Sequence, residues 1–328
     1  MKFDIIIGNP PYQESNGGGG NGKSAKSIYT DFIKTALYAS NEGVCMITPN
    51  RWLTDNNSTA WNLRKYILAK CQIRAIKTYS NSWDIFSNIG NIAGGVGYLY
   101  IANDKKNEKT NIVNNIHGKE ISANIEYNES DNIIITDVLG VSILRKLGTI
   151  KALSELVSQT NPFGLSSNQQ NEEVVDDVDY CKVLTSSGFI SVRRERITKN
   201  INLLQSYKVV TSKYVPSGGF ADKDGRFKVI SKSDILNLGE ACTQSYLVIG
   251  PFLTKNEAIN ICEYLKLKFT RFLMYMATTG ISITADTFMY VPMQDFTKTH
   301  TDKELYKKYN INNQEIEYIE HIIKDFTG

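Results

Sequence analysis

Apolar runs alternate with amphipathic stretches over the first hundred residues. Residues 3–7 and 43–48 are continuous apolar runs stopped by proline-containing segments, which is typical of strands buried on both faces. Residues 28–39 carry apolar side chains at helical spacing. A second helix is predicted over residues 62–69, and further strands over residues 74–78 and 95–101. This order of strands and helices predicts an α/β fold with a largely parallel sheet.

From about Lys151 the pattern changes to polar, asparagine-rich segments with short β-like runs at residues 207–212 and 244–249. A long helix is then predicted, with an apolar face carrying Ile261, Leu265, Phe269, Phe272 and Met276. Three capping boxes mark the starts of this helix and of two terminal helices, at Thr254 with Glu257, Thr301 with Glu304, and Asn312 with Glu315. We therefore predict two domains, residues 1–150 and a mixed α+β domain at residues 151–328.

Composition excludes several classes of protein. Of the 328 residues, 41% are hydrophobic and 22% are charged, as in ordinary globular proteins. No apolar run approaches the roughly 20 residues that cross a membrane, so no membrane partner is expected. Five cysteines lie without CxxC spacing, which predicts neither a metal site nor a disulfide framework. A reducing cytoplasm is the simplest location.

Four residues directly after the first predicted strand carry the clearest chemistry. Asn9 offers a side-chain carbonyl oxygen, and Pro10 offers a backbone carbonyl on a turn stiffened by Pro10 and Pro11. Tyr12 adds a flat aromatic face. Two acceptors beside an aromatic ring suit an exocyclic amine, whose delocalised lone pair makes it a poor nucleophile until charge on nitrogen is stabilised. The glycine-rich residues 17–27 that follow predict a loop, either a simple linker or one that closes over a substrate.

The segment FDIIIGNPPYQ resembles the catalytic motif of bacterial N6-adenine DNA methyltransferases of restriction–modification systems. GVCMITPNRWL resembles the strand and loop that follow in that family, and WDIFSNIGNIAGGVGYLYI its late β-hairpin. The segments NPFGLSSN, TQSYLVIGPF and VPMQDFTKTHTDKELYKKY resemble its target-recognition half. The resemblance implies that Asn9, Pro10 and Tyr12 are catalytic, and that Pro11 and Phe86 line the base pocket.

The same resemblance implies the fold and the reaction. We expect the C-terminal half of a Rossmann-like methyltransferase sheet, with parallel strands and a terminal antiparallel hairpin, followed by a DNA target-recognition domain. The cofactor would be S-adenosylmethionine, and the substrate a flipped-out adenine in double-stranded DNA.

The family's cofactor element, an acidic residue with a glycine-rich turn, should precede the NPPY motif, but only eight residues precede Asn9. We find no later segment that replaces this element, so the cofactor-binding residues remain unknown. Without further strands, the first predicted strand would have a free edge, and such edges invite association. We therefore expect a partner chain or an upstream segment to supply the missing half, and weak or no S-adenosylmethionine binding by this chain alone.

Charge is unevenly distributed within the second domain, although the net charge is only +3. Residues 172–179 contain five acids and no base, whereas residues 182–228 contain ten bases and three acids. This suits a surface facing phosphate, although a solvated face explains it equally well. We predict base or phosphate contacts by Arg193, Arg194 and Arg196. We predict backbone contacts by Lys208, Lys213 and Lys228. Tyr214 and Phe220 either stack on DNA or pack in the core.

Two alternatives to an adenine methyltransferase stay open. One is a non-catalytic DNA-binding specificity subunit or a truncated remnant of such an enzyme. The other is a different methyl acceptor, such as RNA or a protein glutamine, because related NPPY motifs serve those substrates. No nuclease motif is recognisable, so cleavage by this chain is not expected.

Overall fold

The computed structural model describes residues 2–14, 27–54, 58–79, 82, 85–86, 92, 95–106, 108–116, 119–131, 133–219, 221–222, 224–278 and 281–327. The predicted loop over residues 17–26 and the candidate Phe220 lie outside the described residues. The chain divides into two compact units, residues 1–142 and 143–328. None of the described helices is long and apolar enough to cross a membrane.

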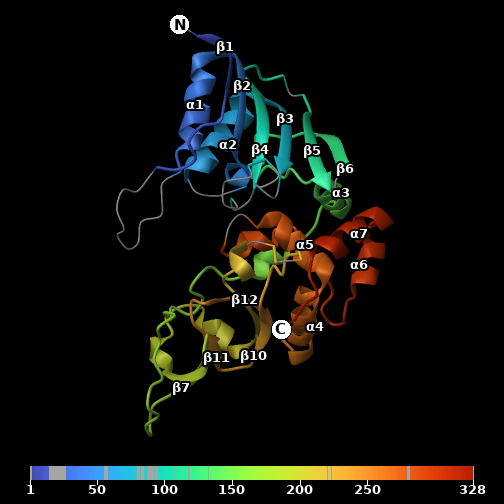
Figure 1. Cartoon of the computed structure of the whole chain (residues 1–328). Coiled ribbons are helices and arrows are strands. Elements are labelled where there is room, and N and C mark those ends of the chain that lie inside the picture. Colours follow the sequence, from blue (N-terminus) through green and yellow to red (C-terminus); the bar gives the residue numbers. More distant parts are fainter. Residues whose placement is uncertain are drawn as a thin grey trace. The chain divides into compact units, whose positions relative to one another are not determined.

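The first unit is built on a six-stranded mixed sheet (Figure 1). Its elements in chain order are β1 (Phe3–Gly8), α1 (Tyr29–Ala39), β2 (Ser40–Pro49), α2 (Ser58–Lys70), β3 (Gln72–Tyr79), β4 (Val96–Ala102), β5 (Thr110–Ile116) and β6 (Lys119–Ile125). Helix α3 (Val138–Leu147) follows, and the boundary between the two units falls inside it.

The strand order is β1-β2-β4-β3-β5-β6. Strands β1 and β2 are parallel, as are β3 and β5. Strand β4 is antiparallel to both of its neighbours, β2 and β3. Two strand pairs are parallel, as predicted, but the other three, β2–β4, β3–β4 and β5–β6, are antiparallel, so the prediction of a largely parallel sheet is wrong. Most of the hairpin predicted over residues 83–101 lies outside the described residues, which place its end in β4. The insertion of β4 between β2 and β3 and the addition of β5 and β6 were not predicted.

Helices α1 and α2 pack on the sheet through one apolar core. The core includes side chains that neighbour each other across β2 and β4, namely Val44 with Ile101 and Met46 with Leu99. Ile33 from α1 and Ile67 from α2 are fully buried in the same core. This packing fixes the positions of the strand ends, where the candidate site lies.

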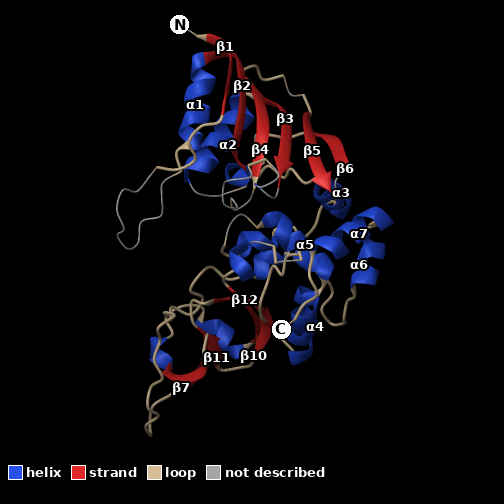
Figure 2. Ribbon diagram, in the orientation of Figure 1, coloured by secondary structure: helices blue, strands red, loops and turns tan. Residues whose placement is uncertain are grey.

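The second unit has mixed α+β character, as predicted (Figure 2). Its two three-stranded sheets have the orders β10-β9-β12 and β11-β7-β8. The strands are β7 (Tyr180–Thr185), β8 (Gly188–Arg193), β9 (Tyr207–Ser212), β10 (Ser233–Leu236), β11 (Glu240–Cys242) and β12 (Tyr246–Phe252). The helices are α4 (Lys255–Lys266), α5 (Lys268–Ala277), α6 (Asp302–Lys308) and α7 (Asn313–Ile322).

All three predicted capping boxes are present, at the starts of α4, α6 and α7. The prediction of a single long helix over residues 254–276 is wrong. The chain is extended at Leu267, with φ −60° and ψ 144°, and so forms two helices, α4 and α5.

Candidate functional site

The NPPY turn follows β1 at the edge of the sheet where the parallel strand β2 also ends. Gly8 of β1 pairs with Met46 of β2, and β2 continues to Pro49. Pro10 is buried, whereas Asn9 and Pro11 are exposed. The buried proline anchors the turn, and the Asn9 amide faces solvent, where a substrate can reach it.

Tyr12 is fastened to the start of α1. Its carbonyl oxygen accepts a hydrogen bond of 3.2 Å from the backbone N–H of Ile28. Its ring meets that of buried Tyr29 edge-on, with centroids 6.3 Å apart and an interplanar angle of 76°. Gln13 also forms an isolated antiparallel bridge with Ser27. The aromatic face of Tyr12 is thus held by both backbone and ring contacts.

The hydroxyl of Tyr12 is suited to neither acid nor base catalysis. Burial raises the pKa of Tyr12, and nearby Tyr98 raises it further. Its oxygen is buried and has no hydrogen-bond partner within the described part of the chain. Tyr12 therefore stays neutral at physiological pH, and what it offers a ligand is its ring.

Tyr98 extends this aromatic surface along the sheet. It lies near the start of β4, and its ring meets that of Tyr79, at the end of β3, with centroids 6.1 Å apart. Lys77 holds its ammonium 5.6 Å from the centre of the Tyr79 ring and pairs with Glu120. Because β4 is antiparallel to β2 and β3, its beginning lies where they end. Tyr98 was not predicted as a site residue, although it occupies an outward position in the strand alternation.

The loop after β2 is fixed beside the same strand ends. The backbone N–H of Asn50 donates to the carbonyl of Gly95 at 3.0 Å. A Cβ at Gly97 would lie 2.6 Å from the Asn50 side-chain oxygen and 2.9 Å from the Lys77 carbonyl, so only glycine fits there. Trp52 is buried, and its carbonyl accepts a hydrogen bond from buried Arg64.

Phe86, the predicted wall of the base pocket, is half-buried, and its backbone N–H donates to the Ser82 carbonyl at 2.9 Å. No ring contact joins Phe86 to Tyr12 in the described residues, so its role stays a prediction. The described residues also form no group of three or more His, Cys, Asp or Glu side chains that could hold a metal ion.

Strand β1 lies at the end of the sheet, as predicted, with β2 as its partner. Its side chains Phe3, Ile5 and Ile7 are 59%, 43% and 80% exposed. The prediction that this strand is buried on both faces is therefore wrong for this chain, because β1 has a strand on one side only. An apolar edge strand of this kind favours pairing with another strand.

The three candidate arginines of the second unit all carry ion pairs to acidic side chains. Arg193 pairs with Glu172 and Glu195, Arg194 with Asp179, and Arg196 with Glu172. The acidic residues 172–179 thus lie against the basic segment and offset its charge. Half-exposed pairs of this kind contribute little to stability. A contact between these arginines and DNA stays a prediction.

The prediction that Lys208 contacts the DNA backbone is wrong. Its side chain is fully buried in β9, and the ammonium donates to the carbonyls of Ser206 at 3.1 Å and Asn237 at 2.9 Å. Burial lowers the pKa of Lys208 to about 8. Lys208 therefore belongs to the core of the second unit.

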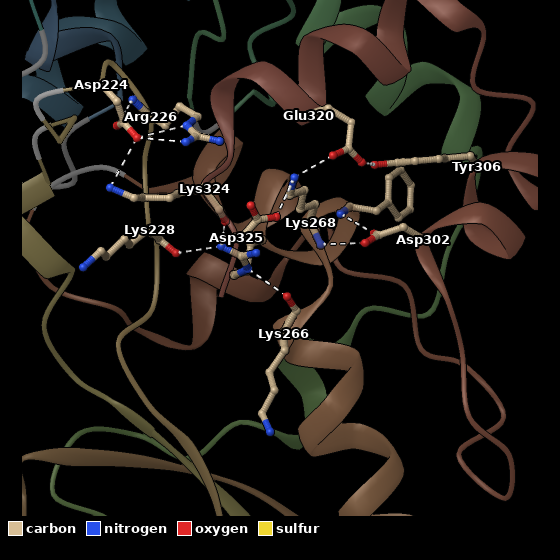
Figure 3. Close-up of polar contacts among 12 residues, drawn as sticks. Asp224, Arg226, Lys228, Lys266, Lys268, Asp302, Tyr306, Glu320, Lys324 and Asp325 are labelled. Atoms are coloured by element: carbon tan, nitrogen blue, oxygen red, sulfur yellow. Dashed lines mark hydrogen bonds and ion pairs between the residues drawn. The ribbon is translucent and has the colours of Figure 1, made fainter. Parts of the chain in front are cut away.

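Lys213 and Lys228 keep their ammonium groups near the surface. Lys213 lies over the ring of exposed Tyr214, 5.9 Å from its centre. Lys228 lies 3.9 Å from Asp222, and its carbonyl accepts a hydrogen bond from Arg271 (Figure 3). Both predicted contacts with the DNA backbone stay predictions.

The buried position of Lys208 gives a testable dependence of stability on pH. The folded-state pKa is about 8, while the ordinary value is 10.5. Between these values the unfolded chain binds more protons than the folded one, so the free energy of unfolding rises with pH. The buried ammonium of Lys208 lowers the free energy of unfolding. This destabilising contribution is fully present below pH 8 and is lost as the pH approaches 10.5. We expect urea unfolding at pH 7.5 and pH 10 to show this rise in the wild type but not in Lys208→Met.

Lys182, an exposed lysine on strand β7 of the other three-stranded sheet, supplies the matched control. Lys182→Met should keep the wild-type rise. Equal rises in Lys208→Met and the wild type would mean that the ammonium of Lys208 is not desolvated.

Comparisons with known proteins find similarity to methylases. Residues 1–86 match the family described as Eco57I restriction-modification methylase. A Mycoplasma pneumoniae protein described as an uncharacterized adenine-specific methylase is 32% identical over 164 residues. That match covers 46% of this chain and 38% of the relative, so the chain spans well under half the length of that relative.

Solved structures give weaker likenesses. The type IIL restriction-modification enzyme MmeI, solved in complex with DNA, has a TM-score of 0.42 at 9% identity, over 88% of this chain and 46% of its own. The type IIG restriction endonuclease BpuSI has a TM-score of 0.35 at 7% identity, over 88% and 45%. A modification subunit of a putative type I restriction enzyme from Vibrio vulnificus has a TM-score of 0.28 at 12% identity, over 48% and 35%.

Proposed function

We propose, from the premise that residues 1–86 belong to the Eco57I restriction-modification methylase family, that this chain supplies the acceptor side of a DNA adenine-N6 methyltransferase. The observation that carries the proposal is the NPPY turn at the end of parallel strand β1. There Asn9 is exposed, and the backbone and ring of Tyr12 are both held by α1.

The geometry of the turn supports a definite role for each residue. The side-chain oxygen of Asn9 and the backbone carbonyl of Pro10 accept the two hydrogens of the adenine amine. These bonds favour a pyramidal nitrogen and stabilise its positive charge as the new N–C bond forms and the methyl–sulfur bond of the donor breaks, which leaves a neutral thioether. The ring of Tyr12 stacks on the adenine, which must first be flipped out of the duplex. Once methylated, the nitrogen returns to neutrality by losing one proton to solvent.

The donor is S-adenosylmethionine, which supplies an electrophilic methyl group when bound. We assign no donor-binding residues, because the family's acidic strand with its glycine-rich turn has no counterpart that we recognise in this sequence. The apolar edge of β1 offers a place where further strands from an upstream segment or a partner chain would extend the sheet. We therefore expect the chain alone to bind S-adenosylmethionine weakly or not at all.

One alternative function stays open beside this proposal. A chain with this fold but no donor site would act as a non-catalytic DNA-binding specificity subunit, or would be a remnant of the enzyme. The two functions differ in the transfer reaction and share the binding of double-stranded DNA.

The test is transfer of a labelled methyl group from S-adenosylmethionine to mixed-sequence DNA. It compares this chain alone with the chain supplemented by the polypeptide that carries the donor-binding strands. Transfer only after addition is the expected result. Transfer by the chain alone would overturn the inference of a missing donor site. No transfer in either case, with DNA binding retained, would favour the specificity subunit. Micromolar binding of S-adenosylmethionine to the chain alone in a calorimetric titration would also contradict the proposal.

A further inference from the structure

A cleft of about 550 Å³ opens in the second unit, and the arginines singled out by the sequence are not among its lining residues. Its walls come from residues 155–159, residues 199–203 and the strand β12. The polar side chains that line it are Glu155, Ser158, Gln159, Lys199, Asn200 and Asn202.

Backbone contacts hold both walls in place. Ser158 and Val248 exchange two hydrogen bonds, from the N–H of Ser158 to the carbonyl of Val248 at 2.7 Å and from the N–H of Val248 to the Ser158 hydroxyl at 3.0 Å. On the other wall, Asn200 adopts the left-handed conformation, with φ 46°, and its amide donates to the Pro162 carbonyl at 2.6 Å. Buried Leu203 then anchors this wall in the core. The cleft is therefore part of the fixed fold.

Three side chains in the cleft have unused hydrogen-bonding capacity. Gln159, Lys199 and Asn202 are exposed, and none of them has a side-chain partner among the described residues. Together they offer two amides, each with a donor and an acceptor group, and one ammonium. This distinguishes them from Arg193, whose guanidinium is already paired with two carboxylates.

The composition of the lining indicates the class of ligand. An amide side chain can bond an adenine through a matched donor and acceptor, and a lysine contacts guanine or phosphate. None of the lining residues is aromatic, so an isolated nucleobase would find no ring on which to stack. The edge of a base pair in an intact duplex needs no such ring.

We propose that this cleft reads base-pair edges of double-stranded DNA, with Gln159 and Asn202 contacting bases and Lys199 positioning the backbone. The inference rests on the proposed function, since it takes the substrate to be DNA. It adds three residues that the sequence analysis did not single out, and it places the reading of sequence in the cleft.

The test measures binding of the full chain to a library of duplexes, separately from methyl transfer. Gln159→Ala and Asn202→Ala should each reduce discrimination at one or two base-pair positions by about 5- to 150-fold, the fold-change that corresponds to one bidentate base contact. Lys199→Ala should weaken binding to all sequences alike and reduce the slope of log affinity against log salt by about 1.

Matched controls come from exposed residues on the terminal helices. Gln314→Ala in α7 and Lys303→Ala in α6 should leave both sequence preference and salt slope as in the wild type. Unchanged sequence preference in both Gln159→Ala and Asn202→Ala would overturn the inference, as would failure of the wild-type chain to bind any duplex.

The two proposals can fail separately. If the completed enzyme transfers methyl groups to DNA but the cleft variants keep the wild-type preference, the cleft inference is wrong and the proposed function stands. If no methyl transfer occurs but the cleft variants alter sequence preference in binding, the inference stands and the specificity subunit becomes the better description.

Discussion

Asn9→Ala should lower the rate of methyl transfer by the completed enzyme by about 10²–10³-fold, by analogy with the loss of one donor from an oxyanion hole. The substitution removes one of the two acceptors proposed to stabilise charge on the adenine nitrogen. Affinity for DNA should barely change, because exposed Asn9 contacts the reacting group rather than the duplex as a whole. Single-turnover transfer and a binding titration on the same DNA measure the two effects.

Asn41 provides the matched control. It is an exposed asparagine on β2, the strand beside β1, but it lies near the start of that strand, far along it from Pro49. Asn41→Ala should transfer methyl groups at the wild-type rate. Full activity in Asn9→Ala would refute the role given to Asn9, and a matching loss in Asn41→Ala would indicate a general effect on folding.

Arg271→Met should lower the free energy of unfolding by about 2–5 kcal/mol, because it removes a buried donor that bonds three backbone carbonyls. The guanidinium is 1% exposed and donates to the carbonyls of Lys266, Lys228 and Lys324, which lie in three separate segments (Figure 3). Burial lowers the pKa of Arg271 to about 10, so it remains charged at neutral pH. The Lys228 carbonyl keeps a hydrogen bond from the Ile230 N–H, whereas the carbonyls of Lys266 and Lys324 lose this donor. A buried group left unpaired costs about 1–3 kcal/mol.

Urea unfolding at neutral pH measures this loss, with Arg226→Met as the control. Arg226 is partly exposed and pairs with Asp224 at 3.0 Å, so its removal should cost less than about 1 kcal/mol. If the two variants lose equal stability, Arg271 does not join the three segments as the hydrogen bonds indicate.

Features with local causes could be predicted from the sequence. A capping box needs two residues three positions apart, so Thr254 with Glu257 was enough to locate the start of α4. The helix break at Leu267 has a distant cause. The carboxylate of Asp302 accepts hydrogen bonds from the backbone N–H groups of Lys268 and Phe269, which caps α5 from more than thirty residues away. An apolar stripe that continues through the break cannot reveal such a cap.

The candidate site divides in the same way. The position of Asn9 after a strand follows from the local pattern, because a continuous apolar run stopped by two prolines marks a strand end. The contribution of Tyr98 follows from pairing between strands, since only the antiparallel insertion of β4 brings its start beside the ends of β2 and β3. Lys208 was mistaken for a surface residue because the two carbonyls that satisfy its ammonium are supplied by the fold.

The position of β4 has a consequence for how the chain is made. Strand β4 is the last of the first four strands to be synthesised, yet it lies between β2 and β3. Until Ala102 has left the ribosome, β2 and β3 each present an unpaired apolar edge to the surroundings, and such edges are prone to aggregation. The protein therefore most needs a chaperone at the stage when β3 has emerged from the ribosome and β4 has not.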